Sequence, residues 1–279
     1  MKPVEKERMM TGAGKPRILL GSIALEPKRW APVKTPSYPV SAWLPRFFED
    51  GFDGVELWGY HWENATPAEQ TALREKAAPL AIYSAYCGFD EGQEDSRRQA
   101  AQGVHELQAQ GVKFNVGNNQ DKTAVYIETV REWAAGLPDG TRLLCECHPG
   151  TLMERADAAK RFFDAWPEER FQALVHPVAQ QMPGMPPLQS LQAWIDALGG
   201  RITHAHMQLR DTDDDFIALE RNEQYVRDAL TLMRDAGFCG TITLEFTAGT
   251  RAPDQTPESL YTAIVRDLEF LRALLEQLY

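Results

Sequence analysis

The chain has 279 residues, of which 43% are hydrophobic and 25% charged, and its 40 acidic and 29 basic residues give a formal net charge of −11. This composition is that of a globular protein with one large core or two small ones. Proteins that grip a nucleic-acid backbone draw their affinity from clustered Lys and Arg, so the acidic balance argues against a nucleic-acid partner. No apolar run approaches the ~18 residues that span a bilayer, and we expect no membrane segment.

The first 16 residues form a polar tail that lacks the apolar core of a signal peptide. We therefore expect a cytoplasmic protein whose single domain occupies residues 17–279. The four cysteines lie mostly in apolar, strand-like segments and include no Cys-x-x-Cys pair; they are Cys87, Cys145, Cys147 and Cys239. This pattern favours buried, reduced thiols over disulfides.

Hydrophobic patterning predicts that strands and helices alternate along the chain. The predicted strands occupy residues 18–25, 51–58, 80–88, 111–117, 143–148, 171–178, 202–208 and 241–247. One helix is expected to begin near residue 66, and the others occupy residues 40–50, 91–110, 122–135, 152–165, 188–198, 219–236 and 258–278. A proline-rich segment, residues 27–39, follows the first strand, and so long an irregular segment often forms the rim of a site.

About eight strands, each followed by a helix, are the signature of a closed parallel barrel. Nothing in the sequence marks a second domain, and the only repetition is the β-α unit itself. The predicted fold is therefore α/β, a single (β/α)8 barrel, and the length suits the about 250 residues typical of that fold.

The segment at residues 143–150, with sequence LLCECHPG, is the most informative part of the chain. It reads as a short strand that ends at Pro149-Gly150. Because side chains alternate along a strand, Glu146 and His148 share one face while the two cysteines point the other way. A carboxylate and an imidazole then lie at the carboxyl end of a strand, where parallel α/β folds bind ligands. Taken alone, the pair is equally compatible with an ordinary polar strand end.

Similar polar residues recur at the carboxyl ends of the later strands. They are Glu146 with His148, His176, His204 with His206, and Glu245. In a barrel these ends converge on one mouth, so residues far apart in sequence can meet. Carboxylates and imidazoles together form a mixed set of oxygen and nitrogen donors, which suits Mn²⁺, Zn²⁺, Co²⁺ or Fe²⁺.

Four short segments carry a resemblance to a known family: residues 53–58 (DGVELW), 146–152 (ECHPGTL), 204–206 (HAH) and 244–246 (LEF). On these segments, and over roughly residues 17–278, the chain resembles the xylose isomerase-like TIM-barrel superfamily. That superfamily contains sugar phosphate isomerases and epimerases, inosose dehydratases, and the nucleases of AP endonuclease family 2.

The resemblance implies one divalent metal ion, held by Glu146, His176, His206 and Glu245. His176 stands where the family usually has Asp. The exchange removes one negative charge and adds a softer donor, so we expect Mn²⁺, Zn²⁺, Co²⁺ or Fe²⁺ rather than Mg²⁺. The family often has a second His three residues after that Asp, where this chain has Ala179. That substrate contact is therefore missing or supplied elsewhere, with His148 and Arg210 as candidates.

The activity implied by the resemblance is that of a sugar isomerase or epimerase that removes a proton next to a carbonyl and passes through an enediolate. Glu146 and Glu245 would remove and return the proton, and His148 is the additional acid or base because an imidazole titrates near neutrality. If the intermediate instead expels a leaving group, the enzyme is a lyase or dehydratase acting on a keto-sugar or keto-glycoside. The candidate substrate contacts are Trp30, Trp58, His61 and Arg210.

Two functions of other classes stay open. A nuclease of this superfamily needs a trinuclear zinc site with further His and Asp ligands, and the second His of strand six is absent here. A metal-free sugar-binding barrel is compatible with the unusual His176. The expected partner is a small carbohydrate, whereas the identity of the sugar, its phosphorylation and the oligomeric state, including a homo-oligomer, are not fixed by the sequence.

Overall fold

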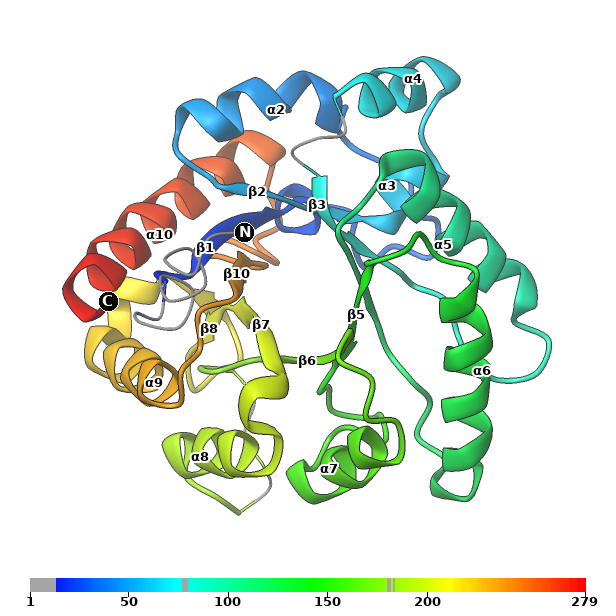
Figure 1. The fold of residues 1–279 in the computed structure, drawn as a ribbon. Coiled ribbons are helices and arrows are strands. Elements are labelled where there is room, and N and C mark those ends of the chain that lie inside the picture. Colours follow the sequence, from blue (N-terminus) through cyan, green and yellow to red (C-terminus); the bar gives the residue numbers. More distant parts are fainter. Residues whose placement is uncertain (1–13, 77–79, 180–181, 183) are drawn as a thin grey trace, which may run out of the picture.

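The computed structural model of the protein describes residues 14–76, 80–179, 182 and 184–279. The barrel strands are β1 (Arg17–Gly21), β2 (Gly54–Trp58), β3 (Leu80–Ser84), β4 (Gly111–Phe114), β5 (Arg142–Glu146), β6 (Phe171–Val175), β7 (Ile202–Met207) and β10 (Thr241–Leu244). They close in the order β1-β10-β7-β6-β5-β4-β3-β2, and neighbouring pairs such as β5–β6 and β10–β7 are parallel (Figure 1). The predicted (β/α)8 barrel is confirmed. Of the predicted polar tail, residues 1–13 lie outside the described residues.

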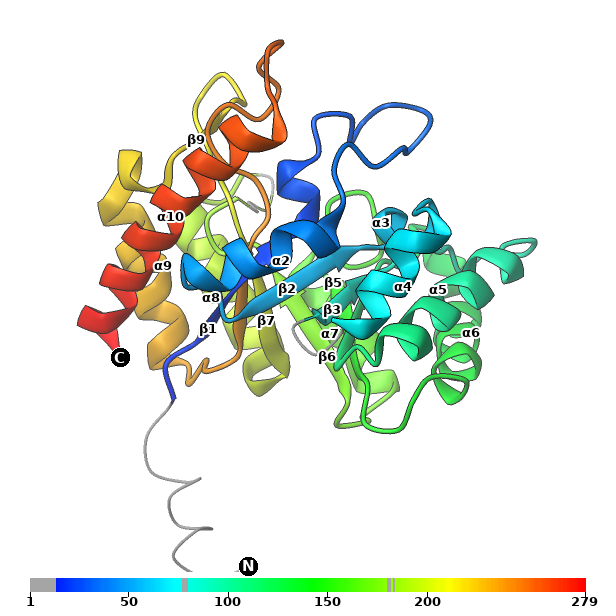
Figure 2. The same ribbon diagram turned by 90° about the horizontal axis from the view of Figure 1, so that it is seen from above.

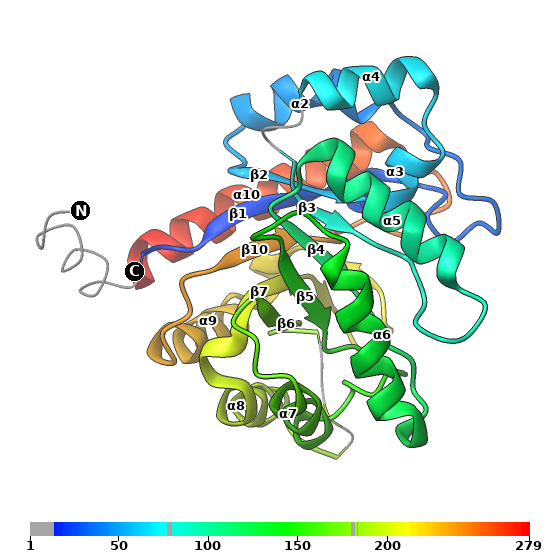
Figure 3. The same cartoon turned by 45° about the vertical axis from the view of Figure 1, so that its right-hand side comes forward.

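Helices surround the barrel on its outside. They are α2 (Val40–Glu49), α3 (Gly59–Glu63), α4 (Pro67–Glu75), α5 (Glu94–Leu107), α6 (Thr123–Ala135), α7 (Ala156–Ala165), α8 (Pro187–Leu198), α9 (Glu223–Asp235) and α10 (Pro257–Leu278). Figure 3 shows α5 and α6 side by side outside strands β3, β4 and β5. Within the described ranges, no helix is both long enough and apolar enough to cross a membrane.

The alternation of side chains along the strands divides the molecule into two environments. Outward-facing residues such as Cys145 and Cys147 join the main core between strands and helices. A separate apolar cluster, which includes Leu19, Ile82 and Leu144, lies on the inner face. Glu146 follows Leu144 by two residues, so the inner face changes from apolar to polar toward the carboxyl ends of the strands.

The first predicted strand is shorter than expected. It ends at Gly21, and Ser22–Leu25 forms the short 3-10 helix η1. Two hydrogen bonds to Ser22 hold this turn in place. Ser22 Oγ accepts from the backbone N–H of Trp58, and the Tyr38 hydroxyl donates to the carbonyl of Ser22. These contacts come from distant segments, so hydrophobic patterning in residues 18–25 could not reveal them.

The helix predicted at residues 152–165 also begins later, at Ala156. The backbone N–H of Leu152 donates to the carbonyl of Gly117 at 2.8 Å, which ties this segment to the neighbouring loop instead of to a helical turn. Residues 147–155 therefore form an irregular loop that stands over the end of β5.

Loops at the carboxyl ends of the strands build a raised rim. One part is a short antiparallel hairpin, β8 (Leu209–Arg210) with β9 (Phe216–Ile217), which the sequence did not predict. Trp30 from the proline-rich segment lies 6.4 Å from Phe216 and 5.9 Å from Phe246, measured between ring centroids. Figure 2 shows these loops projecting on the same side of the barrel. Three segments that are distant in sequence thus form one wall above the strand ends.

Candidate active site

Three of the predicted metal ligands meet at the carboxyl ends of adjacent strands. Glu146 ends β5, His176 follows β6, and His206 lies in β7. His176 Nε2 lies 2.8 Å from Glu146 Oε1, and His206 Nδ1 lies 3.9 Å from the same oxygen. One donor atom from each residue lies within 4.8 Å of the others, and all three side chains are buried. The structure therefore brings three of the four predicted ligands together.

The fourth predicted ligand, Glu245, follows β10 and lies next to the other three ligands, where it contacts His206. Its Oε2 lies 3.3 Å from His206 Nδ1. His206 Nδ1 is buried and has no hydrogen-bond partner among the described residues, although it faces oxygens of both Glu146 and Glu245. A buried polar atom without a partner is costly, and a divalent cation bound by these nitrogen and oxygen donors would satisfy it. The four residues fit such an ion.

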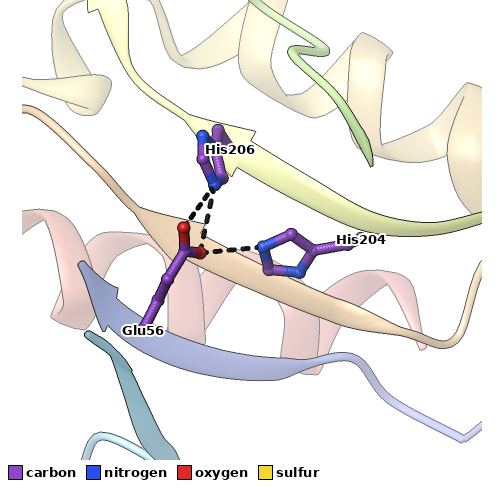
Figure 4. A group of neighbouring side chains, drawn as sticks. All are labelled: Glu56, His204 and His206. Carbon is purple, nitrogen blue, oxygen red and sulfur yellow. Dashed lines mark hydrogen bonds and ion pairs between the residues drawn. The ribbon is translucent and has the colours of Figure 1, made fainter. Parts of the chain in front are cut away.

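Glu56, on β2, holds His206 from behind (Figure 4). His206 Nε2 lies 3.1 Å from both oxygens of Glu56, and His204 Nε2 lies 3.0 Å from Oε2. Thr243 Oγ1 donates to the same Oε2 at 2.8 Å. An imidazole that donates its Nε2–H to a carboxylate keeps the lone pair of Nδ1 available for a metal. Glu56, His204 and His206 could themselves group around an ion, but these contacts already satisfy them.

The charges of this buried group reinforce one another. Burial alone would raise the pKa of Glu56, but His206 and His204 outweigh it and hold that pKa well below its usual value. Burial alone would lower the pKa of His206, but the carboxylates of Glu56 and Glu245 raise it well above the ordinary value. The charges of Glu56 and His206 therefore stabilise each other.

Sequence reasoning missed Lys113 and Asn115 of the β4 segment. Lys113 Nζ lies 2.6 Å from Glu146 Oε2, and Asn115 Nδ2 donates to the same oxygen at 2.7 Å. Burial would raise the pKa of Glu146, but Lys113 and then His176 lower it well below the usual range. The signal was present in the sequence, because Val112 and Phe114 alternate with these polar residues and direct them to the inner face.

A cavity of about 570 Å³ opens above the ligands. It is lined by three of the four predicted substrate contacts, Trp30, Trp58 and Arg210, and by His148. Trp58 Nε1 is buried, and no residue in the described part of the chain accepts a hydrogen bond from it. His148 is exposed, and its Nδ1 lies 2.7 Å from the carbonyl of Pro149, so Nδ1–H donates there and Nε2 stays free.

The fourth predicted substrate contact, His61, lies away from the cavity wall. It is buried in α3, where its Nδ1 lies 2.9 Å from Ser22 Oγ and its Nε2 lies 3.1 Å from Glu26 Oε2. Glu26 also accepts from the backbone N–H of Ser37 at 2.8 Å. His61 therefore links η1 to the proline-rich segment through Glu26, and its contacts are with the protein and not with the cavity.

Comparison with protein-family models gives no match, and comparison with curated protein sequences gives none either. Solved structures do match. The 3-keto-D-glucoside 4-epimerase YcjR of E. coli is 17% identical over 93% of this chain and 100% of its own, with a TM-score of 0.61. AsbF of Bacillus anthracis, described as a probable 3-DHS dehydratase, is 17% identical over 88% of this chain and 98% of its own, with a TM-score of 0.61.

A third match is the IOLI protein with a bound zinc atom, which is 12% identical over 94% of this chain and 99% of its own, with a TM-score of 0.65. At these identities the likeness is one of fold, and it extends over almost the whole chain. The strand-end motifs and the closed barrel agree with it. The chain therefore has the fold of the xylose isomerase-like TIM barrels.

Proposed function

We propose that the protein is a divalent-metal-dependent sugar isomerase or epimerase, which abstracts a proton next to a carbonyl and passes through an enediolate. The observation that carries this proposal is the convergence of donor atoms from Glu146, His176 and His206 within 4.8 Å, beside Glu245, beneath an open cavity. A metal site under a cavity of this size suits a small polar substrate. The epimerase and dehydratase folds that match the chain support the same reaction class.

Glu146, His176, His206 and Glu245 would hold the cation, and Glu56 would keep His206 oriented toward it. When bound, a divalent cation supplies Lewis acidity that makes the C–H next to a substrate carbonyl more acidic. The mixed nitrogen and oxygen donor set favours Mn²⁺, Zn²⁺, Co²⁺ or Fe²⁺ over Mg²⁺. Metal binding is therefore part of the proposal, and metal analysis of the purified protein tests it.

Two carboxylates are available for proton transfer, and they are not equivalent. Glu146 already interacts with Lys113, Asn115 and His176. Glu245 lines the cavity, and within the described ranges His206 is the one side chain that pairs with it. We assign the first proton abstraction to Glu245, because it has the freer oxygens, and the return of the proton to Glu146 on the other side of the substrate.

His148 and the aromatic residues would bind and orient the sugar. His148 lines the cavity and has a free Nε2, which suits it to exchange a proton with a substrate hydroxyl. Trp58 Nε1–H donates to no residue that the structure describes and can donate to a sugar oxygen, while the half-exposed Trp30 offers an apolar ring face. Arg210 also lines the cavity.

Deuterium exchange tests this function directly. Metal-loaded protein is incubated with ketoses and 3-keto-glycosides in D₂O, and deuterium is sought beside the carbonyl by NMR. We expect exchange with the metal-loaded protein and none after chelation. A protein that holds no metal and exchanges no proton, yet binds a sugar, would instead be a metal-free sugar-binding barrel.

A lyase or dehydratase is the second candidate, and the state of Glu146 favours it. With one oxygen of Glu146 bound by Lys113 and Asn115 and the other by His176, Glu245 is the less encumbered base. Elimination needs one base and a group that protonates the departing oxygen, for which His148 is placed. The same D₂O experiment separates the two: an epimer keeps all its carbon and oxygen atoms and has one C–H replaced by C–D, whereas elimination releases water and lowers the product mass.

A further inference from the structure

We infer that the substrate carries an anionic terminus, either a carboxylate or a phosphate, which binds to a basic rim formed by Arg29, Lys34, Arg210 and Arg251. The inference rests on the proposed function, since the rim and the metal ligands line the same cavity. It adds the chemical class of substrate, an acidic sugar or sugar phosphate, which the metal ligands alone do not specify.

Arg29 is the first indication of an anion. It is only 2% exposed, and it lines the cavity. Its hydrogen bonds go to the carbonyls of Ile23 and Ala24 and to Gln255, all of which are neutral. Two aromatic rings also cover the guanidinium, whose Cζ lies 5.1 Å from the Trp30 ring and 5.6 Å from the Phe246 ring. Glu26 and Glu245 lie near enough to act on its charge, but neither is among these hydrogen-bond partners. An anion that accepts a hydrogen bond from Arg29 would therefore stabilise this buried cation further.

The other three cations extend this positive wall. Lys34 Nζ donates to the carbonyl of Arg29 at 2.7 Å, again a neutral partner. Arg210 and Arg251 both pair with Asp214, at 2.5 and 3.2 Å, so one carboxylate faces two guanidinium groups. The Arg251 guanidinium also lies 5.3 Å from the Trp30 ring, which connects it to the same wall as Arg29.

The charge balance of the cavity contrasts with that of the chain. The protein as a whole has a net charge of −11, yet its rim presents four cations, and Asp214 pairs with two of them, Arg210 and Arg251. At the floor lie Lys113 and two carboxylates, Glu146 and Glu245, so five cations of the lining face these two carboxylates and Asp214. A bound metal would add further positive charge. A neutral sugar would leave this excess uncompensated, whereas a terminal carboxylate or phosphate would compensate it through charge-assisted hydrogen bonds.

Three ketoses of one carbon skeleton test the inference: D-fructose, D-fructose 6-phosphate and D-fructuronate. Binding to the purified full chain is measured by calorimetry, with inorganic phosphate as a probe that needs no sugar. We expect at least one of the two anionic ketoses to bind roughly ten- to hundredfold more tightly than D-fructose. A preference for the phosphate or for the carboxylate identifies which terminus the rim takes.

Lys34→Gln and Arg251→Gln remove rim charge from exposed or half-exposed side chains, and each should reduce the preference for the anion about tenfold while metal content stays constant. Lys160→Gln is the matched control, because Lys160 lies on α7, pairs with Asp164 and leaves the cavity lining unchanged. The two rim substitutions are made in separate variants. Each variant is first checked for the melting temperature of the wild type.

Three results would overturn the inference. The first is that D-fructose binds as tightly as both anionic ketoses. The second is that every anionic probe, inorganic phosphate included, binds the rim variants as tightly as the wild type. The third is that the preference for the anion vanishes on chelation but persists in the rim variants, which assigns the anion to the metal. The proposed function fails differently, by an absence of metal or of deuterium exchange, and that failure leaves the binding preference measurable.

Discussion

At the scale of single residues, the orientation of His206 depends on Glu56. Glu56→Gln keeps the shape of the side chain but removes the charge that faces His206 Nε2 at 3.1 Å. Loss of such a carboxylate behind a ligating His typically weakens metal binding about 10- to 100-fold. We expect a shift of that size in a metal titration of the variant.

The control for this substitution is Glu132→Gln, which alters an exposed carboxylate on α6. It should leave metal affinity as in the wild type. If Glu56→Gln binds metal as tightly as the control does, Glu56 only packs against the two histidines and has no part in preparing a ligand.

His148 should act on the substrate and not on the metal. It lines the cavity and is exposed, and its ring centroid lies 6.1 Å from that of His176. Removing a general acid or base costs about 10² to 10⁴ in rate, so His148→Ala should keep its metal and lose most of its turnover. Metal analysis and kcat on the same preparation check this. Loss of metal would make His148 a ligand, and full turnover would make it an ordinary polar residue at a strand end.

At the scale of secondary-structure elements, Asp267 joins α10 to two neighbouring segments. Its carboxylate accepts hydrogen bonds from the backbone N–H of Leu219 at 2.8 Å and from Thr247 Oγ1 at 2.6 Å. Burial raises its pKa to about 6, from a usual value of 3.8. A raised pKa means that the folded state holds this proton more tightly than the unfolded state does.

The contribution of Asp267 is therefore fully present below about pH 4 and is lost as the pH rises through about 6, by about 3 kcal/mol in total. Asp267→Asn keeps both acceptor and donor capacity but cannot titrate. Urea unfolding of the wild type and the variant between these pH values should show the wild type losing stability relative to the variant as the pH rises. Parallel stability curves would contradict the assignment of this pKa to Asp267.

The elements also explain which parts of the site the sequence could predict. Strand geometry fixes an alternation of two residues, so the inward face of Glu146 followed from residues 143–148 alone. Lys113 obeys the same rule, but its partner depends on β4 lying next to β5 in the closed barrel. His61 was predicted to contact substrate from its place after β2, whereas its actual partner, Glu26, comes from a loop that hydrophobic patterning does not describe. Local periodicity predicts which face of a strand a side chain occupies, whereas the contacts of a loop depend on the tertiary structure.

At the scale of the whole molecule, the proposed metal would link β5, β6, β7 and β10, which are half of the strands of the barrel and lie next to one another. These segments also interact directly, through His–carboxylate pairs such as His176 with Glu146. A ligand that binds only the folded state stabilises it, by about 2.7 kcal/mol at 100 times its dissociation constant. The barrel should therefore be more stable with metal than without.

We expect chelation to lower the melting temperature by roughly 5 °C or more, since 1 kcal/mol corresponds to about 2 to 4 °C in a chain of this size class. Adding back Zn²⁺ or Mn²⁺ should restore it, and Mg²⁺ should do so less well because the donor set includes two imidazoles. In His206→Ala the difference between chelated and metal-loaded protein should disappear, because His206 contacts both carboxylates of the site. If the wild type melts at one temperature with and without these ions, the four strands are held by their own ion pairs and the metal assignment is wrong.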